Sequence, residues 1–303
     1  MSKKINVIMG QEGELSFARI KYDGAYNLSK TLDCGQCFRW ERVKDSNHEN
    51  EWIGVACGKL ISVAQEDDEL IIYNSTKEEF DELWAHYFAL DEDYEAIDNE
   101  LLEKCQNPTF VKALEEGKGI RILHQEPWEA VCSFIISQNN NIPRIKKIID
   151  TISFALGKQI DSTLMENHGA KDKEFYSFPT ADAVLAAGEE FIFSLKTGFR
   201  AKYIIDAAQK WCSGEINEEE LKNIEKLDNA LAYLCKVKGI GLKVASCALL
   251  FGFERYDPFP IDVWMKRVLD KYFEKDFDPS TFGKYAGVAQ QYLFDFERTM
   301  GDK

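Results

Sequence analysis

The chain has 303 residues, of which 45% are hydrophobic and 29% charged, and its formal net charge is −15. This composition is typical of a folded globular protein with two or three packed units. No apolar run approaches the ~20 residues of a membrane-spanning helix, and the first residues lack the apolar core of a signal peptide. The sequence therefore predicts an intracellular protein without a membrane partner, in the cytoplasm or nucleoid of a bacterium or the nucleus of a eukaryote.

The net charge taken over the whole chain argues against a nucleic-acid partner, because phosphate contacts dominate DNA affinity. The charges are unevenly distributed, however, with most acidic runs between residues 67 and 103 and between 216 and 225. Basic residues gather in four short stretches, at 144–147, 196–202, 236–243 and 265–267. A local basic surface can bind DNA whatever the net charge, although each stretch alone is equally typical of a solvated helix face.

Residues 14–74 carry the pattern of short β-strands. Five segments rich in β-branched and aromatic residues alternate with turns or polar breaks. They cover residues 14–20, 36–43, 51–58, 59–65 and 69–74. No helical stretch separates them, as a parallel sheet would require, so the sequence predicts an antiparallel sheet.

From Thr76 onward the apolar spacing becomes helical. Pro127, Pro143 and Pro179 mark the first turns of three predicted helices. Further helices are predicted at 200–212, 226–236, 242–253, 262–274 and 281–298. The sequence thus predicts an α+β protein with an N-terminal β-sheet domain and linking helices over residues 1–125, followed by a larger, all-helical domain over 126–303.

Eight cysteines lie at positions 34, 37, 57, 105, 132, 212, 235 and 247. Only Cys34 and Cys37 are closely spaced, and neither a second such pair nor a βαβ pattern accompanies them. We therefore expect the cysteines to be small buried hydrophobes rather than metal ligands or redox groups, and no metal site is predicted.

The clearest local signal is a glycine turn between two predicted helices. Gly239 and Gly241 flank Ile240, and the pattern predicts a helix-hairpin-helix over about 226–253. Glycines permit the tight turn, and the second helix offers free N–H groups and its positive dipole end to a DNA phosphate. A Gly-x-Gly turn also occurs in many proteins that bind no DNA, so the motif alone leaves an ordinary turn open.

A lysine and an aspartate add chemistry to this hairpin. Lys243 lies in the first turn of the second helix, where the dipole disfavours the charged ammonium and favours the nucleophilic neutral amine. Asp262 follows nineteen positions later at a predicted helix start. Its ordinary role there is an N-cap, and its functional role would be to stabilise a cationic sugar. A surface lysine and a capping aspartate are each commonplace, but together with the hairpin they indicate a catalytic pair.

Four further segments complete the pattern: Gly-Gln-Cys-Phe-Arg-Trp at 35–40, the triple-asparagine segment 133–144, Gly-Phe-Arg-Ala-Lys-Tyr at 198–203, and Gln-Gln-Tyr-Leu-Phe at 290–294. With the hairpin, they resemble the 8-oxoguanine DNA glycosylase/AP lyase family of the helix-hairpin-helix glycosylase superfamily, from about residue 26 to about 296. The resemblance implies a bifunctional enzyme that flips 8-oxoguanine out of duplex DNA, excises it through a lysine Schiff base and cleaves the strand by β-elimination. It also implies a monomer that needs no cofactor.

The resemblance assigns roles at the damaged base. Lys243 is the implied Schiff-base nucleophile, and Asp262 is the implied essential carboxylate. Gly35 would offer its carbonyl to the N7–H that only the oxidised base carries. Base recognition would be completed by Cys247 and Phe294, which would sandwich the base, and Gln290, which would read its Watson–Crick edge. The spacing agrees, since Cys247 follows Lys243 and Phe294 follows Gln290 by four residues, which places each pair on one helical face.

The resemblance also implies a DNA-contacting set. Asn139 would fill the space that the flipped base leaves, and Phe199 would wedge beside it. Arg144 and Arg200 would face the orphaned opposite base. The hairpin backbone would hold a phosphate. The full set is Asn139, Asn140, Arg144, Phe199, Arg200, Gly239, Gly241 and Val244.

The sequence departs from the family at three positions of this DNA face. Lys238 stands where many relatives have proline, Trp264 where vertebrate-type members have histidine, and Phe199 in place of tyrosine. Two alternatives stay open: a glycosylase for another damaged purine, such as an alkylated one, and a non-enzymatic DNA-binding protein that uses the hairpin as a clamp. The pair of Lys243 and Asp262 argues against a clamp, which needs neither residue.

Overall fold

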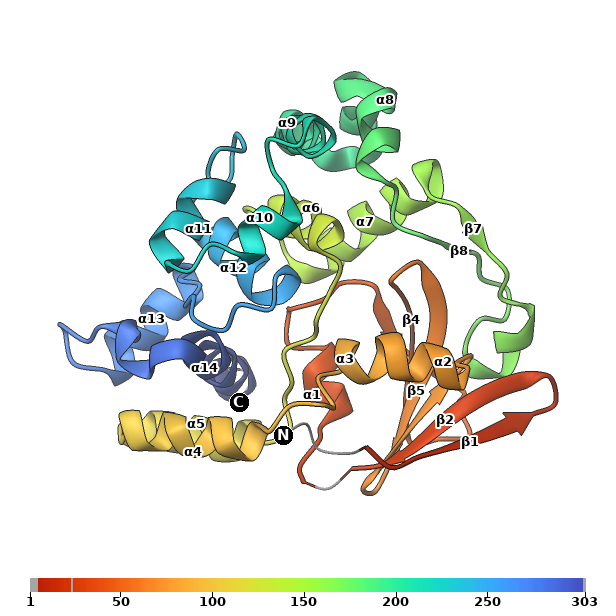
Figure 1. Ribbon diagram of the computed structural model, residues 1–303, viewed down its shortest axis with the longest axis horizontal. Coiled ribbons are helices and arrows are strands. Elements are labelled where there is room, and N and C mark those ends of the chain that lie inside the picture. Colours follow the sequence, from red (N-terminus) through yellow and green to blue (C-terminus); the bar gives the residue numbers. More distant parts are fainter. Residues whose placement is uncertain (1–4, 23, 302–303) are drawn as a thin grey trace.

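The computed structural model describes residues 5–22 and 24–301. Its N-terminal part contains a six-stranded sheet in the order β1-β2-β6-β5-β4-β3, with every neighbouring pair antiparallel (Figure 1). The strands are β1 (Val7–Glu12), β2 (Leu15–Lys21), β3 (Trp40–Arg42), β4 (Asn50–Ala56), β5 (Lys59–Glu66) and β6 (Glu69–Tyr73). The predicted antiparallel sheet is confirmed.

Strand β1 was not predicted from the sequence, and its packing gives the reason. Its central Gly10 lies opposite Phe17 of β2, and a Cβ at Gly10 would lie 2.3 Å from the Phe17 ring. The Phe17 ring of the neighbouring strand β2 fills the space that a side chain at position 10 would take. Glycine itself has a low β-propensity, which weakens the strand signal of β1.

The sheet is covered on both faces. On one face, Trp52 and Val63 belong to the same hydrophobic core as the helical segment formed by α2 (Lys77–Glu79), the π-helical turn η1 (Phe80–Trp84) and α3 (Ala85–Tyr87). On the other face, Ile53 packs in a second core with residues near the 3-10 segment η2 (Thr163–His168). The central strands therefore read as nearly continuous apolar runs, because neither face meets solvent.

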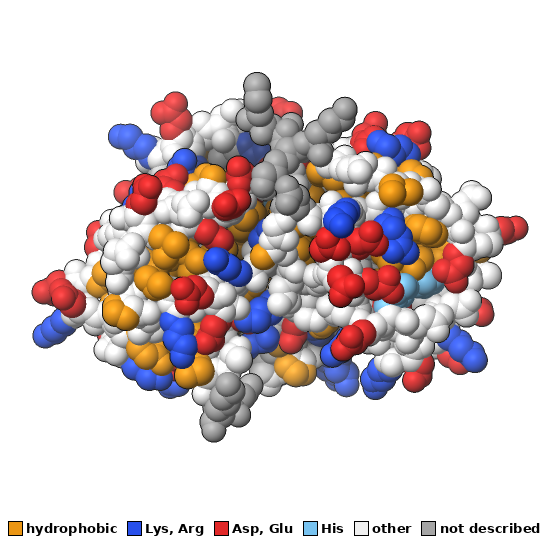
Figure 2. Space-filling model, turned by 90° about the horizontal axis from the view of Figure 1, so that it is seen from below, with side chains coloured by type: hydrophobic (Ala, Val, Ile, Leu, Met, Phe, Trp, Pro, Cys, Tyr) orange, Lys and Arg blue, Asp and Glu red, His pale blue; other side chains and the backbone are white. Residues whose placement is uncertain are grey.

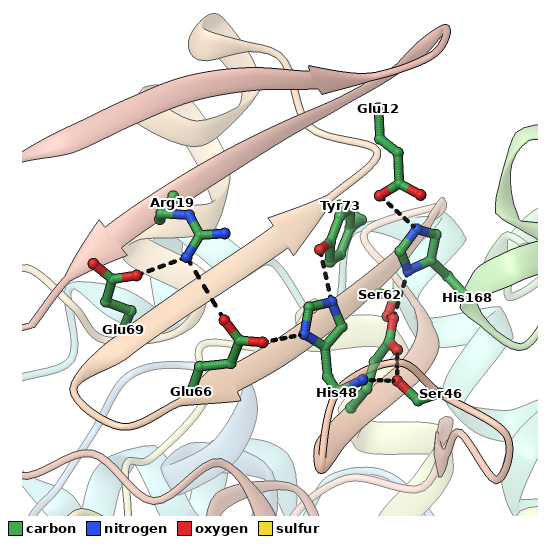
Figure 3. Close-up of polar contacts among 10 residues, drawn as sticks. Glu12, Arg19, Ser46, His48, Ser62, Glu66, Glu69, Tyr73 and His168 are labelled. Atoms are coloured by element: carbon green, nitrogen blue, oxygen red, sulfur yellow. Dashed lines mark hydrogen bonds and ion pairs between the residues drawn. The ribbon is translucent and has the colours of Figure 1, made fainter.

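A polar cluster links the second face of the sheet to η2 (Figure 3). The carboxylate of Glu51, only 1% exposed, accepts hydrogen bonds from His168 Nδ1 at 2.7 Å, from Ser62 Oγ at 2.6 Å and from Ser46 Oγ. Nearby, His48 lies 2.6 Å from Glu66 Oε1 and 2.7 Å from Tyr73 Oη. We call Ser46, His48, Glu51, Ser62, Glu66, Tyr73 and His168 the sheet polar cluster.

The rest of the chain is largely helical. Its longer helices are α4 (Tyr94–Lys104), α5 (Pro108–Gly117), α6 (Pro127–Ser137), α7 (Ile142–Leu156), α8 (Ala181–Ile192), α9 (Ala201–Ser213), α11 (Leu227–Leu234), α12 (Leu242–Gly252), α13 (Val263–Tyr272) and α14 (Ala286–Gly301). Shorter elements are α1 (Leu28–Leu32), α10 (Glu218–Lys222), η3 (Phe193–Thr197), η4 (Gly198–Arg200), η5 (Pro279–Tyr285), β7 (Gln159–Ile160) and β8 (Phe175–Tyr176). The helices predicted near 200, 226, 242 and 262 are confirmed.

The prediction of an all-helical part over residues 126–303 is wrong at one place, and one predicted helix begins at a different residue. The strands β7 and β8 form a two-stranded sheet between α7 and α8 (Figure 1). The last predicted helix starts later than expected, because η5 precedes it and Gly283 has a positive φ of 66° that breaks the α-helical path. Helices α4 and α5 belong to the same core as α14, which follows them by more than a hundred residues (Figure 1). The division at residue 125 stays a prediction.

The surface carries charges of both signs. On the face in Figure 2, Lys and Arg side chains stand beside Asp and Glu side chains across the whole width. Among the described residues, no helix is long and apolar enough to cross a membrane. All eight cysteines are free thiols, and Cys34, Cys37, Cys105, Cys132 and Cys247 are buried. Cys212 is exposed, so the expectation of burial is wrong for that residue.

Candidate active site

The glycine turn predicted from the sequence joins α11 to α12. Gly239 has φ +80°, and a Cβ there would lie 2.3 Å from the Tyr203 ring, so only glycine fits both the conformation and the space. Ile240 is 5% exposed and plugs the inside of the turn. Gly241 is exposed and is the N-cap of α12, with no side chain capping the helix. The first N–H groups of α12, which include that of Val244, therefore have no intrahelical partner.

Lys243 occupies the first turn of α12 and reaches into a pocket. Its Nζ lies 5.8 Å from the centroid of the Phe134 ring, which in turn stacks on Phe251 at 5.3 Å. The Cys247 thiol lies one turn further along the same helix face. Burial raises the pKa of the Cys247 thiol, and the neighbouring Lys243 acts in the opposite direction. The lysine amine thus has an aromatic floor and a neutral thiol beside it.

Asp262 has both of the roles that its sequence position allowed. Its Oδ1 accepts a hydrogen bond of 2.8 Å from the backbone N–H of Met265, and Asp262 is the N-cap of α13. The same residue lines a pocket together with Lys243. No ion pair within 4.0 Å joins these two residues. The capping bond fixes the carboxylate at the pocket edge, while the amine is not tied to it.

The structure brings together all six residues predicted to carry catalysis and base recognition. We call this the central pocket. Its predicted members are Gly35, Lys243, Cys247, Asp262, Gln290 and Phe294. They come from the loop before β3, from α12, from the start of α13 and from α14, so segments far apart in sequence converge on one cavity.

The loop that carries Gly35 is held by two buried glutamines. Gln291 Nε2 donates to the Cys34 carbonyl at 3.0 Å. Gln36 donates to the carbonyls of Thr31 at 2.8 Å and Arg121 at 2.7 Å. Gly35 itself has φ +79°, and no donor among the described residues bonds to its carbonyl. Three side-chain hydrogen bonds thus hold the loop in place, and a backbone acceptor beside the central pocket is left available.

The triple-asparagine segment forms the turn between α6 and α7. Asn139 is exposed with φ +48°, a conformation that asparagine adopts more readily than most residues. Asn140 Nδ2 donates to the Ile136 carbonyl at 3.2 Å, and Asn141 caps α7 through the N–H of Arg144 at 3.0 Å. Asn139 therefore projects from a turn that its neighbours stabilise, and the Arg144 side chain is exposed.

Phe199 and Arg200 occupy different environments although they are adjacent. Phe199 is 49% exposed and contacts Tyr203 edge-on, with ring centroids 6.0 Å apart. Arg200 is 3% exposed and donates to the carbonyl oxygens of Gln138, at 2.9 Å from its Nε, and Asn139, at 3.1 Å. In this structure the Arg200 guanidinium therefore holds the asparagine turn from beneath.

Several residues that shape the site were not singled out from the sequence. Phe134 and Phe251 form the floor under Lys243, and Pro260 and Gln291 line the central pocket. Asp206 of α9 accepts from the Lys238 backbone N–H at 2.8 Å and thereby supports the hairpin. The adjacent glutamines at 290 and 291 of α14 both line the central pocket, and only the packing shows that Gln291 also braces the loop that carries Gly35.

The sequence is similar to that of known proteins over most of its length. The model for the N-terminal domain of 8-oxoguanine DNA glycosylase matches residues 20–131. The N-glycosylase/DNA lyase OGG1 of Arabidopsis thaliana is 29% identical over 292 residues, which span 88% of this chain and 76% of the relative.

Two solved structures are similar over almost the whole chain. One is the MBOgg1 structure with a low-affinity DNA ligand, which is 37% identical with a TM-score of 0.86 and covers 99% of this chain and 100% of that one. The other is the 8-oxoguanine glycosylase/lyase of Clostridium acetobutylicum in complex with double-stranded DNA containing cytosine opposite 8-oxoguanine. It is 34% identical, has a TM-score of 0.84 and covers 99% of each chain.

Proposed function

Because the chain belongs to the 8-oxoguanine DNA glycosylase family, and is accordingly an N-glycosylase/DNA lyase acting on 8-oxoguanine, we propose that the central pocket is its active site, with Lys243 as the nucleophile and Asp262 as the catalytic carboxylate. One observation carries this assignment: the lysine, the carboxylate and the four recognition residues line a single cavity. A DNA clamp that performs no chemistry would need neither the lysine nor the carboxylate.

The reaction starts with a nucleotide outside the helix, since the duplex hides the glycosidic bond. The flipped base enters between Cys247 and Phe294, where a buried neutral thiol and an aromatic ring offer two flat, apolar contacts. Gln290 is 7% exposed and makes no side-chain hydrogen bond to another described residue, so both ends of its amide are available to the base edge.

Lys243, in its neutral form, attacks C1′ of the flipped nucleotide. The C1′–N9 bond breaks, its electron pair leaves with the base, and the base takes up a proton at N9. The Asp262 carboxylate stabilises the positive charge that develops on the sugar. Loss of a proton from the amine and opening of the sugar ring give an imine between Lys243 and C1′. The imine acidifies the C2′ proton, and its removal expels the 3′ phosphate by β-elimination.

Gly35 distinguishes the lesion from guanine. 8-Oxoguanine carries a hydrogen on N7, whereas guanine has an acceptor there. The Gly35 carbonyl accepts a hydrogen bond from the lesion but opposes the lone pair of guanine, leaving two buried acceptors unpaired. Such a mismatch costs about 1–3 kcal/mol. The bracing of this loop by Gln36 and Gln291 supports the role, because a discriminating acceptor must not move away from the wrong base.

The duplex is held along a surface next to the central pocket. Gly239, Gly241 and Val244 present the uncapped N-terminus of α12 to a phosphate. Asn139 fills the space left by the flipped nucleotide, Phe199 wedges beside it, and Arg144 faces the opposite base. Asn140 and Arg200 belong to the same DNA-contacting set, with Arg200 also facing the opposite base, and their side chains stabilise the asparagine turn. We place the enzyme inside the cell, where its DNA substrate is, and we propose that it acts as a monomer.

Borohydride trapping on defined duplexes tests this function. The enzyme is incubated with a duplex carrying 8-oxoguanine, with the same duplex carrying guanine, and with one carrying an alkylated purine. We expect a covalent protein–DNA adduct with the 8-oxoguanine duplex alone. Release of the alkylated purine without an adduct would instead assign the pocket to a monofunctional glycosylase.

A further inference from the structure

Two histidines and a glutamate meet at a site distinct from the central pocket. His86 lies in α3, His124 in the segment that leads to α6, and Glu254 just after α12. One nitrogen or carboxylate oxygen of each residue lies within 4.8 Å of those of the other two. His86 Nε2 is 3.1 Å from His124 Nδ1 and 3.2 Å from Glu254 Oε2. The proposed excision reaction uses none of these side chains.

The neighbours of His124 determine where its proton lies. Tyr256 Oη is 2.7 Å from both His124 Nε2 and Glu92 Oε1. A carboxylate oxygen accepts, so the Tyr256 hydroxyl donates its hydrogen bond to Glu92 Oε1. His124 Nε2 must therefore carry a hydrogen and donate it to the Tyr256 oxygen. In the neutral imidazole this leaves a lone pair on Nδ1, the nitrogen that faces His86 and Glu254.

The contact between the histidines is not a directed hydrogen bond. His124 Nδ1 lies 3.3 Å from Nδ1 and 3.1 Å from Nε2 of His86, so it approaches the ring between the two nitrogens. A hydrogen bond needs one N–H to point along the contact. Two nitrogens that share a tetrahedral zinc ion lie about 3.3 Å apart, because each Zn–N bond is about 2.0–2.1 Å. The separation of 3.1 Å between the two histidines and that of 3.2 Å between His86 and Glu254 match those of ligands around one ion, and all three side chains offer a ligand atom within 4.8 Å of the others.

The surrounding charge also favours a cation. Asp91, Glu92 and Glu254 are the carboxylates at this site, and Lys222 is 3.5 Å from Glu254 Oε1. Asp91 Oδ1 and Glu92 Oε2 are buried without a hydrogen-bond partner. His124 itself is only 7% exposed. The Asp91 and Glu254 side chains are 38% and 36% exposed, and a divalent ion at this point would offset the local excess of negative charge.

We propose that His86 Nε2, His124 Nδ1 and Glu254 bind one Zn²⁺ ion. Two imidazoles and one carboxylate are a ligand set that zinc accepts, with water completing the tetrahedron. The second coordination shell is present as well, since metal-bound histidines usually donate their other N–H to a fixed acceptor. His124 does so through Tyr256 and Glu92, and His86 Nδ1 lies 3.4 Å from Asp91.

The position of this site gives the ion a structural role. Glu254 follows the C-terminal end of α12, whereas Lys243 lies in the first turn, roughly 15 Å away along the helix. His86 belongs to the helical cover of the sheet, so the ion joins that cover to the helix that carries the nucleophile. Zinc therefore fixes α12 against the N-terminal part and contributes no step to excision.

Metal titration of the chelator-treated, full-length protein tests the site. We expect one equivalent of Zn²⁺ to raise the thermal midpoint and one equivalent of Co²⁺ to give the visible bands of a tetrahedral nitrogen–oxygen site. His86→Asn and Glu254→Gln should each weaken binding at least about 100-fold, and Tyr256→Phe about 10–100-fold, as second-shell changes do. His48→Asn, which alters a histidine of the sheet polar cluster, should leave Zn²⁺ affinity unchanged. Far-UV circular dichroism checks that each variant is folded.

Several results would overturn the assignment. One is a wild-type protein that binds no ion, and another is equal affinity in His86→Asn and Glu254→Gln. A sulfur-to-cobalt charge-transfer band would place the ion on a cysteine instead. A thermal midpoint that ignores Zn²⁺ but loses its pH dependence in His86→Asn would show that protons, rather than a metal, occupy the cluster.

Discussion

The sheet polar cluster and the central pocket contain similar groups but differ in how those groups are engaged. Glu51 in the sheet accepts three hydrogen bonds, from His168, Ser62 and Ser46. In the central pocket the Gly35 carbonyl accepts none from the described residues, and no ion pair joins Lys243 to Asp262. Buried polar groups without partners destabilise a fold unless a ligand completes them. The difference thus separates groups that hold the structure from groups that await a substrate.

The largest expected effect comes from removing the nucleophile. Lys243→Gln should bind lesion DNA but neither excise the base nor form a borohydride-trapped adduct, because the amide cannot attack C1′. Excision assays and gel-shift titrations measure the two properties separately. Since Lys243 makes no ion pair with Asp262, thermal stability should change little. Residual trapping in this variant would mean that another lysine is the nucleophile.

The opposite result is expected in the sheet. Glu51→Ala removes the shared acceptor of His168 and two serines, and leaving a buried donor unsatisfied in this way lowers the free energy of unfolding by about 1–3 kcal/mol. Urea denaturation measures the loss. At temperatures where the variant is still folded, its excision rate should match that of the wild type. A large loss of excision by folded Glu51→Ala would contradict the separation of the two regions.

Asp262 both caps a helix and lines the central pocket, and one substitution separates these two roles. Asparagine caps helices about as well as aspartate, so Asp262→Asn keeps the bond to Met265 and the stability of α13. It removes the charge, and excision should fall about 10²–10³-fold, as when a single stabilising group is lost from a transition state. Single-turnover kinetics measure the loss of excision, and thermal melting tests whether the stability is kept. Equal excision by both proteins would leave Asp262 with the capping role alone.

Gly35→Ala should have a smaller effect, confined to recognition. A Cβ at Gly35 meets the Phe294 ring at 3.6 Å, an ordinary contact, but φ is +79°, which alanine adopts only with strain. The carbonyl therefore shifts, and lesion excision should fall by the equivalent of about 1–3 kcal/mol. Affinity for undamaged duplex should be unchanged. Parallel losses in excision and in duplex affinity would indicate damage to the loop rather than to recognition.

Glu129 of α6 belongs neither to the sheet polar cluster nor to the central pocket, and it tests what burial does to a single carboxyl group. Burial raises the pKa of its carboxyl to about 7, although Arg39, 3.6 Å away, acts in the opposite direction. Because the folded pKa lies above the ordinary value, the contribution to stability is complete below about pH 4.5 and is lost as pH rises through 7. Glu129→Gln should flatten the pH dependence of unfolding between pH 5 and 8. The expected difference is at most roughly 3 kcal/mol. An unchanged pH dependence of unfolding in Glu129→Gln would show that the pKa of Glu129 is not raised in the folded protein.

The sequence predicts the central pocket better than it predicts its supports. Lys243, Asp262 and the glycine turn stand out because their types and spacing are specific to one chemistry. Phe134 and Gln291 do not, since an apolar residue in α6 and the second of two glutamines in α14 are compatible with many packings. Arg200 illustrates the same limit: the sequence gives its charge, but only the packing shows that its guanidinium binds the Gln138 and Asn139 carbonyls.

The fold, too, was predictable where the signals are local and not where they depend on packing between distant residues. Helices α9, α11, α12 and α13 were predictable from apolar periodicity and glycine breaks, which are local properties. Strand β1 was not, because its Gly10 is packed by a ring from β2. The polar pairing of Glu51 with His168 joins residues 117 positions apart, and no local pattern reveals it.

Peptide mapping of the borohydride-trapped complex tests the central claim most directly. The wild-type enzyme is trapped on a duplex that carries 8-oxoguanine, the protein and DNA are digested, and mass spectrometry identifies the lysine that carries the sugar remnant. Our account predicts the modification on Lys243, with little on Lys238 or Lys236 of the same hairpin. A remnant on any other lysine, or on the N-terminal amine, would contradict it.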